Sequence, residues 1–275
     1  MMTALNSIDW CCVAAVNRSD ILAENLAASP VFVENPGILQ VERGWSTAGA
    51  AYNSGKRSAK TEIVVFAHQD VYLPRGWNAL LAQRIRQLDT LDPNWAVAGV
   101  MGIGPGGIHC GHVWSTGLGR ELGANFGAPI ATSSLDEVLL ILKRSSGLSF
   151  DPDLPSFHLY GTDIVQMALQ AGLGAYVIHA PVIHNSRPVQ TLSGGFTEAY
   201  HYMQQKWAFA LPIRTLVTEI AETDAPLQRT EEQLQTRRLL KRARRVWATA
   251  RFGRGGVAGQ PSPASIASKL GYERD

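Results

Sequence analysis

The feature that most constrains the fold is a run of five apolar residues, Ile63–Ala67, that ends abruptly at His68, Gln69 and Asp70. A run without polar residues at alternate positions predicts a strand that is buried on both faces. In an open α/β sheet, ligands bind at the edge formed by the carboxyl ends of the strands. The run therefore predicts a carboxylate and an imidazole at such an edge, although Asp70 could instead only cap the following turn.

Strand and helix patterns alternate along most of the chain. Further strands are predicted from apolar runs at 10–16, 31–34, 95–101, 138–143 and 175–178. Helices are predicted between them, at 21–29, 46–54, 77–88, 162–171 and 196–209. This alternation predicts the α/β class, with an open, mostly parallel sheet covered by helices on both faces. Residues 102–130 are rich in glycine and predict a long loop, which in a compact domain is usually functional or mobile.

The composition allows one large domain and sets limits on its environment. Of the 275 residues, 45% are hydrophobic, and the net charge of +2 argues against a general binder of polyanions. Three cysteines, two of them adjacent, do not suggest a disulfide framework and fit a reducing compartment. Residues 1–10 lack the pattern of a signal peptide, and no run is long enough to span a membrane. We therefore expect a cytoplasmic protein that could be peripheral to the inner face of a membrane.

The C-terminal part differs in composition from the rest. We predict an α/β domain over residues 8–220 and a basic helical tail with a flexible C-terminus over residues 221–275. Arginines crowd the tail between 229 and 254, with apolar residues such as Trp247 between them. Such a helix can lie on an anionic membrane surface. Alternatively, it packs on the domain or forms a dimer interface. A nucleic-acid-binding role would depend on the tail alone, and we expect no specific nucleic acid partner.

Three more polar residues lie at the ends of predicted elements. His184 follows the strand-like run VIHAPVI, and a neutral histidine can bind a metal. Asp136 precedes a predicted strand, and Asp163 lies in the first turn of a predicted helix, where it could simply complement the helix dipole. A divalent metal bound to a nucleotide diphosphate needs few protein ligands, because phosphates and water fill the other positions. Asp70 with His184 would be sufficient for such a site.

Two motifs between residues 102 and 112 carry little weight. The sequence GIGPGG matches the dinucleotide pattern G-x-G-x-x-G, but the residues that follow do not open the helix that would hold a pyrophosphate. His109, Cys110 and His112 match no structural zinc spacing and lack a fourth ligand. We expect neither a dinucleotide site nor a zinc site there.

Several segments together resemble bacterial family-2-like glycosyltransferases of the GT-A fold, in a subgroup with an HQD motif. The segments are AYNSG at 51–55, VVFAHQDVYLPRGW at 64–77, FHLYGTDIVQMALQAGLGAYVI at 157–178, IHNS at 183–186 and QKW at 205–207. The resemblance implies a Rossmann-like, nucleotide-diphospho-sugar transferase domain over residues 8–220. It also implies a nucleotide-sugar donor, a divalent metal (Mg or Mn), and transfer of the sugar, with inversion, to a glycan or lipid-linked acceptor.

The resemblance also assigns roles to individual residues of the donor site. Asp70 matches the last acid of the family's metal-binding D-x-D motif, and His68 replaces the first acid. His184 matches a late histidine that can complete the metal and pyrophosphate shell. The residues that the resemblance places at the donor are Asn17, Arg18, Asn53, His68 and Asp70.

The general base is the point at which the chain departs from the family. Related transferases carry the base as the second acid of an E-D or Y-D pair, but here Tyr160 is followed by Gly161, which cannot accept a proton. The resemblance leaves Asp163, two residues later, or Asp136 to deprotonate the acceptor hydroxyl. Because this acid is missing, a protein that binds nucleotide sugars or glycans without catalysis is an alternative. A metal-dependent phosphohydrolase is another alternative, which would usually need more carboxylates at the strand ends.

Overall fold

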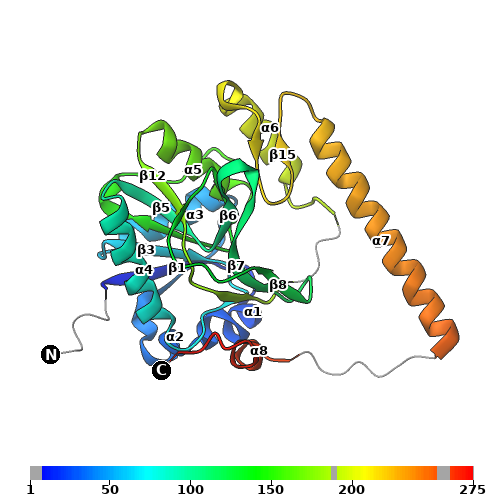
Figure 1. Cartoon of the computed structure of the whole chain (residues 1–275), viewed down its shortest axis with the longest axis horizontal. Helices are drawn as coiled ribbons and strands as arrows, with labels where there is room; N and C mark the ends of the chain where they lie inside the picture. Colours follow the sequence, from blue (N-terminus) through cyan, green and yellow to red (C-terminus); the bar gives the residue numbers. More distant parts are fainter. Residues whose placement is uncertain (1–7, 187–190, 253–260, 275) are drawn as a thin grey trace.

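The protein is an α/β body with a long helix standing beside it (Figure 1). The computed structural model describes residues 8–186, 191–252 and 261–274, with the backbone alone over 241–252. In the described part of the chain, no helix is long and apolar enough to cross a membrane.

The main sheet has seven strands and is mostly parallel. In spatial order they are β2 (Leu39–Glu42), β1 (Trp10–Ala15), β3 (Ile63–Ala67), β11 (Leu139–Lys143), β5 (Trp95–Gly99), β12 (Gly174–Val177) and β9 (Ile130–Ala131). β1, β2, β3, β5 and β12 run in one direction, and β11 and β9 run in the other. The predicted α/β class with an open, mostly parallel sheet is therefore confirmed.

A second sheet is built largely from the segment that we predicted as a loop. It contains β10 (Ser134–Leu135), β6 (Met101–Ile103), β7 (His109–Ser115), β13 (Val182–His184) and β4 (Val71–Tyr72), with β8 (Arg120–Gly123) paired to β7. The loop prediction for 102–130 was wrong because paired short strands with glycine at bends show no clear periodicity. The GIGPGG motif forms the 3₁₀ turn η3 (Pro105–Gly107) between the antiparallel strands β6 and β7.

Helices cover both faces of the main sheet, as the buried strands require. The helices of the body are α1 (Ser19–Glu24), α2 (Pro30–Glu34), α3 (Ala48–Ser58), α4 (Trp77–Leu91), α5 (Tyr160–Gln170) and α6 (Phe196–Lys206). In β3, Val64 and Phe66 belong to one core cluster, whereas Val65 and Ala67 belong to the cluster on the opposite face. All of β3 is buried, which confirms the strand predicted from Ile63–Ala67.

Two predicted elements near the N-terminus differ from the structure. Residues 31–34 were predicted as a strand but form α2, because Pro30 occupies the first helical position, where its fixed φ favours a helix. The strand that pairs with β1 is β2, whose sequence LQVE gives only a weak apolar pattern. The predicted helix 21–29 is divided into α1 and the 3₁₀ turn η1 (Leu26–Ala28).

The C-terminal residues leave the body and return to it. The first turn of α7 (Ala225–Phe252) packs on the hairpin of β14 (Ile213–Arg214) and β15 (Glu219–Ile220), and the rest extends away (Figure 1). After residues 253–260, which lie outside the described residues, α8 (Pro263–Lys269) packs against β13. Ile266 and Tyr272 are buried there beside Tyr72 and Ile183. The domain boundary at 220/221 stays a prediction, but the described end of the predicted tail is part of the packed body.

Tyr272 ends a polar chain that runs into the body. Its hydroxyl donates to Glu121 Oε1 at 2.6 Å and lies 3.1 Å from His112 Nε2, while His112 Nδ1 lies 3.0 Å from His179 Nε2. Burial, with the neighbouring His112 and Arg84, lowers the pKa of His179 to about 4. His112 thus has a structural environment, separate from His109 and Cys110.

The low pKa of His179 makes its contribution to stability depend on pH. The unfolded state takes up a proton below its pKa of 6.5, whereas the folded state does so only near 4. Stability is therefore complete above 6.5 and falls as the pH decreases toward 4. We expect His179→Gln to reduce the difference in unfolding free energy between pH 7 and pH 5 by about 2 kcal/mol, measured by urea unfolding. An unchanged difference would contradict this role.

Candidate active site

Strand pairing brings His68, Asp70 and His184 together. Asp70 immediately precedes β4, which pairs with β13 so that Val71 lies opposite His184. His184 Nε2 lies 3.5 Å from Asp70 Oδ1, and the His68 and His184 rings are 5.8 Å apart between centroids. One nitrogen or oxygen from each of the three residues lies within 4.8 Å of the others. We call this group the His-Asp-His cluster; its members are only partly buried, so a ligand can reach them.

The charges in the His-Asp-His cluster suit a divalent cation. Burial opposes ionisation of Asp70, but the hydrogen bond and charge of His184, with a smaller effect of His68, outweigh it and lower its pKa to about 2. Burial lowers the pKa of His68, and Asp70 raises that of His184 despite burial. Asp70 is therefore a carboxylate and His68 a neutral imidazole at neutral pH. Metal binding requires these protonation states and would also displace the proton that the raised pKa favours on His184. Two imidazoles and one carboxylate can hold a first-row divalent ion.

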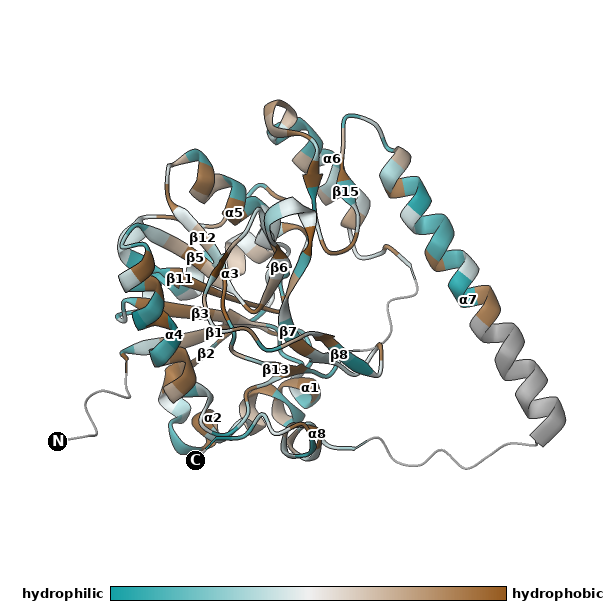
Figure 2. Cartoon of the chain, in the orientation of Figure 1, coloured by the Kyte–Doolittle hydropathy of each residue, from teal (hydrophilic) through white to brown (hydrophobic). Residues whose placement is uncertain are grey.

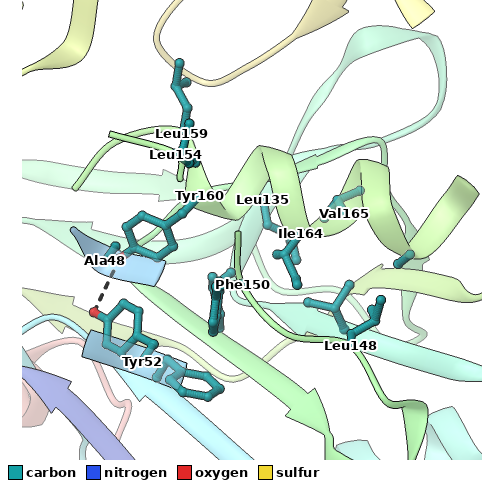
Figure 3. Packing of buried hydrophobic residues seen from close by; sticks show 14 of the residues in the cluster. Ala48, Tyr52, Leu135, Leu148, Phe150, Leu154, Leu159, Tyr160, Ile164 and Val165 are labelled. Carbon is teal, nitrogen blue, oxygen red and sulfur yellow. Dashed lines mark hydrogen bonds between the residues drawn. The ribbon is translucent and has the colours of Figure 1, made fainter. Parts of the chain in front are cut away.

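Tyr160, at the start of α5, contacts His68 of the His-Asp-His cluster. The Tyr160 hydroxyl lies 3.0 Å from His68 Nε2, 3.3 Å from the Glu137 carbonyl and 3.4 Å from the Tyr52 hydroxyl. Figure 3 shows the dashed line that joins Tyr160 and Tyr52, with Phe150 beside them, and the Phe150 ring contacts both tyrosine rings. The His68 backbone N–H donates to the Val138 carbonyl at 3.2 Å. Packing and hydrogen bonds thus hold His68 in place before any ligand arrives.

Gln69, which the sequence reasoning did not single out, connects the cluster to the end of β1. Its Oε1 accepts from the backbone N–H groups of Asn17 (3.2 Å) and Arg18 (3.0 Å), and its Nε2 donates to Asn17 Oδ1 at 2.6 Å. The exposed Arg18 side chain pairs with Asp20. Asn17 and Arg18 therefore lie beside the cluster, as a shared nucleotide site would require. In the sequence, only the position of Gln69 between His68 and Asp70 in the HQD motif could have suggested this role.

Asn53 does not join this group. Its Nδ2 donates to the Phe150 carbonyl at 2.7 Å, and its Oδ1 accepts from the Phe150 N–H at 3.0 Å. Both ends of the amide are thereby used to fix the chain at Phe150. Asn53 therefore affects the site only indirectly, because it holds the backbone of Phe150 in place.

The structure also places Asp163 away from solvent and in an ion pair. Its Oδ1 accepts from Trp207 Nε1 at 2.7 Å, its Oδ2 accepts from Lys206 Nζ at 2.9 Å, and the residue is 1% exposed. Lys206 also contacts Asp151 at 2.6 Å. These contacts join α5 to the end of α6. In this arrangement the Asp163 carboxylate is buried and already accepts from two partners, so an acceptor hydroxyl could reach it only after Lys206 or Trp207 moved.

The buried ion pair predicts a large effect on stability. Asp163→Ala would leave the Trp207 N–H and the Lys206 ammonium without a partner on α5, so we expect the unfolding free energy to fall by about 3 kcal/mol. Glu34→Ala is the matched control, because both members of the ion pair of Glu34 with Arg75 are exposed, so the pair should contribute about 0–1 kcal/mol. Urea unfolding of both variants measures the difference, and equal small losses would contradict the structural role of Asp163.

A cavity of about 460 Å³ opens beside the start of α5. It is lined by residues from four parts of the chain: Leu135, Asp136, Glu137, His158, Leu159, Thr162, Thr191, Leu192, Ser193, Phe196, Thr215, Leu216 and Val217. Two of these residues, Asp136 and Glu137, are half-buried acids. Tyr160 links the cavity to the cluster, because its hydroxyl lies 3.3 Å from the carbonyl oxygen of Glu137 and 3.0 Å from His68 Nε2.

Glu137 is the residue of this cavity that the sequence reasoning missed. Burial, with a smaller effect of Asp136, raises its pKa to about 8, while the backbone N–H groups of Gly161 and Leu159 oppose the rise. Gly161 has no room for a side chain, because a Cβ there would lie 2.5 Å from the Leu135 carbonyl oxygen. The Glu137 carboxyl thus lies beside the backbone of Gly161, the position at which the resemblance places an acid. The adjacent pair Asp136-Glu137 was the available signal.

Comparisons with known proteins give similarity over part of the chain. No family model matches. The curated protein "ATP synthase subunits region ORF 6" from Fuscovulum blasticum is 31% identical in an alignment 159 residues long that covers 54% of this chain and 59% of that protein. The match therefore spans less than two thirds of that relative.

Solved structures with a related fold are more distant in sequence. GalNAc-T7 with UDP, GalNAc and Mn²⁺ has a TM-score of 0.46 at 13% identity, covering 83% of this chain and 55% of its own. Mannosyltransferase PcManGT from Pyrobaculum calidifontis, in complex with GDP-Man and Mn²⁺, has a TM-score of 0.46 at 16% identity, covering 96% and 80%. S. aureus TarS 1-349 with UDP-GlcNAc has the same score at 13% identity, covering 72% and 65%. Likeness at this level concerns the fold and does not define an activity.

Proposed function

We propose that this protein is a GT-A-type, metal-assisted glycosyltransferase of the family-2-like group. It would move a sugar from a nucleotide-diphosphate sugar to a glycan or lipid-linked acceptor, with inversion. The observation that carries the proposal is the His-Asp-His cluster at the carboxyl end of β3, next to a cavity with two acids. Donor and acceptor sites must adjoin in this way, because the sugar passes directly between them.

The donor would bind between the cluster and the end of β1. Asp70 and His184, with His68, would hold a divalent metal, which supplies Lewis-acid neutralisation of the leaving diphosphate. Asn17 and Arg18, positioned by Gln69, would contact the nucleotide. Arg18 is exposed and can turn from Asp20 toward an anionic ligand.

The acceptor would occupy the cavity, where a carboxylate must take the proton of its hydroxyl. The hydroxyl oxygen forms a bond to C1 of the sugar as the bond from C1 to the diphosphate oxygen breaks. We propose Asp136 or Glu137 as the base, since both line the cavity. Asp163 could serve only if it were released from Lys206 and Trp207.

A thermal-shift screen of nucleotide sugars with Mn²⁺ or with EDTA tests the donor class. A donor at about 100 times its Kd should stabilise the fold by about 2.7 kcal/mol, which raises Tm by several degrees. The same donor in EDTA should give a clearly smaller shift, because the diphosphate then has no cation at Asp70. If no nucleotide sugar raises Tm, or if the shifts in Mn²⁺ and EDTA are equal, the proposal is wrong.

The glycine at position 161 favours one alternative, a protein that binds nucleotide sugars or glycans without catalysis. Such a protein would show the same Mn²⁺-dependent stabilisation. It would release no nucleoside diphosphate from the bound donor, with or without an acceptor. Product release therefore separates the two functions.

A further inference from the structure

The outer half of α7 contains apolar residues on one side and cationic residues on the other. Leu239 and Leu240 are 66% and 55% exposed, although leucines of this size are normally covered. Figure 2 shows the described part of α7 as mostly hydrophilic, with a hydrophobic band near the end of that part. The sequence continues the apolar positions at helical spacing of three and four residues, with Ala243, Val246, Trp247 and Ala250. One stripe of the helix is therefore apolar over about three turns.

The positions between the apolar ones are cationic. They are Arg237, Arg238, Lys241, Arg242, Arg244, Arg245 and Arg251, and the sequence has no acidic residue between 233 and 252. A helix with a wide cationic face opposite an apolar stripe lies in the plane of an anionic bilayer, its stripe at the level of the acyl chains. The helix is too polar to cross the membrane.

The root of α7 is fixed to the wall of the cavity. Thr218 of the β14–β15 hairpin donates through Oγ1 to the Pro226 carbonyl at 3.1 Å, and Thr230 Oγ1 donates to Thr218 Oγ1 at 2.9 Å. The tip of the same hairpin contributes Leu216 and Val217 to the cavity lining. If a surface binds α7, the β14–β15 hairpin therefore links that surface to the cavity.

We propose that α7 is a docking helix for an anionic lipid surface, with Leu239 and Leu240 on the side that enters the bilayer. Charge complementarity selects this occupant: a second copy of the chain would bring another cationic helix against the first, and like charges repel. The inference stands on α7 alone and does not depend on the proposed transfer reaction.

Co-sedimentation of the full chain with vesicles tests the proposal. We expect binding to vesicles that contain phosphatidylglycerol, little binding to pure phosphatidylcholine, and weaker binding as salt rises. Leu239→Glu/Leu240→Glu should reduce binding on the order of tenfold or more, and Arg237→Gln/Arg238→Gln on the order of tenfold. Leu91→Glu, at an equally exposed leucine of α4, is the matched control and should bind like the unchanged chain.

Binding of α7 to a second copy of the chain or to nucleic acid would give different results. Because Leu239 and Leu240 are exposed, the double variant should keep the circular dichroism spectrum and Tm of the unchanged chain. No binding to anionic vesicles, or equal binding by the double variant, would overturn the proposal. A dimer in sedimentation velocity that the double variant dissolves, or tighter binding to duplex DNA than to vesicles at physiological salt, would also overturn it.

Discussion

Asp70→Ala is expected to lower Mn²⁺-dependent release of nucleoside diphosphate from a nucleotide sugar on the order of 100-fold or more. Asp70 is the one carboxylate of the His-Asp-His cluster, and a pKa of about 2 keeps it ionised at any working pH. Without it, two imidazoles remain and the cluster has no carboxylate to balance the cation. The measurement is steady-state release of the diphosphate over a range of Mn²⁺ concentrations.

Asp89→Ala is a suitable control for this loss. Asp89 lies on α4, where it pairs with Lys143 and accepts from Trp95 Nε1 outside the site, so its removal should leave the turnover of the folded protein unchanged. Equal turnover in Asp70→Ala and the unchanged chain at every Mn²⁺ concentration, low and saturating, would remove Asp70 from the site. A loss that high Mn²⁺ restores would instead show that Asp70 acts through metal affinity.

Glu137→Gln is expected to lower kcat about 10²- to 10⁴-fold, the usual contribution of a general base. The amide keeps the size of the side chain but cannot accept the proton. Asp136→Asn should cost less, because Asp136 Oδ1 already accepts from the Val138 N–H at 2.9 Å. In the unchanged chain, kcat/KM should rise with pH up to about 8, as the Glu137 carboxyl ionises, and this rise should disappear in Glu137→Gln.

The same series distinguishes the roles of the three acids. Asp163→Asn should reduce stability while kcat of the folded protein changes little, because Asp163 holds Lys206 and Trp207. If kcat falls for Asp163→Asn and not for Glu137→Gln or Asp136→Asn, the base is Asp163 as the resemblance first implied. If none of the three changes kcat, the cavity does not supply the base.

The main sheet could be predicted because its strands are buried on both faces. Runs such as Ile63–Ala67 contain no polar residue, so their strand character does not depend on tertiary context. The candidate metal ligands Asp70 and His184 could be placed at strand ends for the same reason, since each comes at the end of an apolar run. His184 Nε2 lies 3.5 Å from Asp70 Oδ1 because β4 pairs with β13. Neither of these two short strands has a sequence pattern that predicts the pairing.

The parts that were missed depend on contacts between distant segments. β2 is recognised as a strand only when paired with β1, and the strands between 101 and 123 only when they pair with each other and with β13. Glu137 gained its position from the approach of Leu135 to Gly161, a distance of 26 residues along the chain. The base role of Asp163 was implied by the resemblance, and only the packing of α6 onto α5 shows its partners.

Isothermal titration of a nucleotide sugar, followed by measurement of diphosphate release in the same sample, tests the central claim most directly. We predict Mn²⁺-dependent binding to the unchanged chain and slow release of the nucleoside diphosphate, both lost in Asp70→Ala and retained in Asp89→Ala. Binding without release would support a non-catalytic nucleotide-sugar-binding protein. The absence of Mn²⁺-dependent binding for every nucleotide sugar would contradict a donor site at His68, Asp70 and His184.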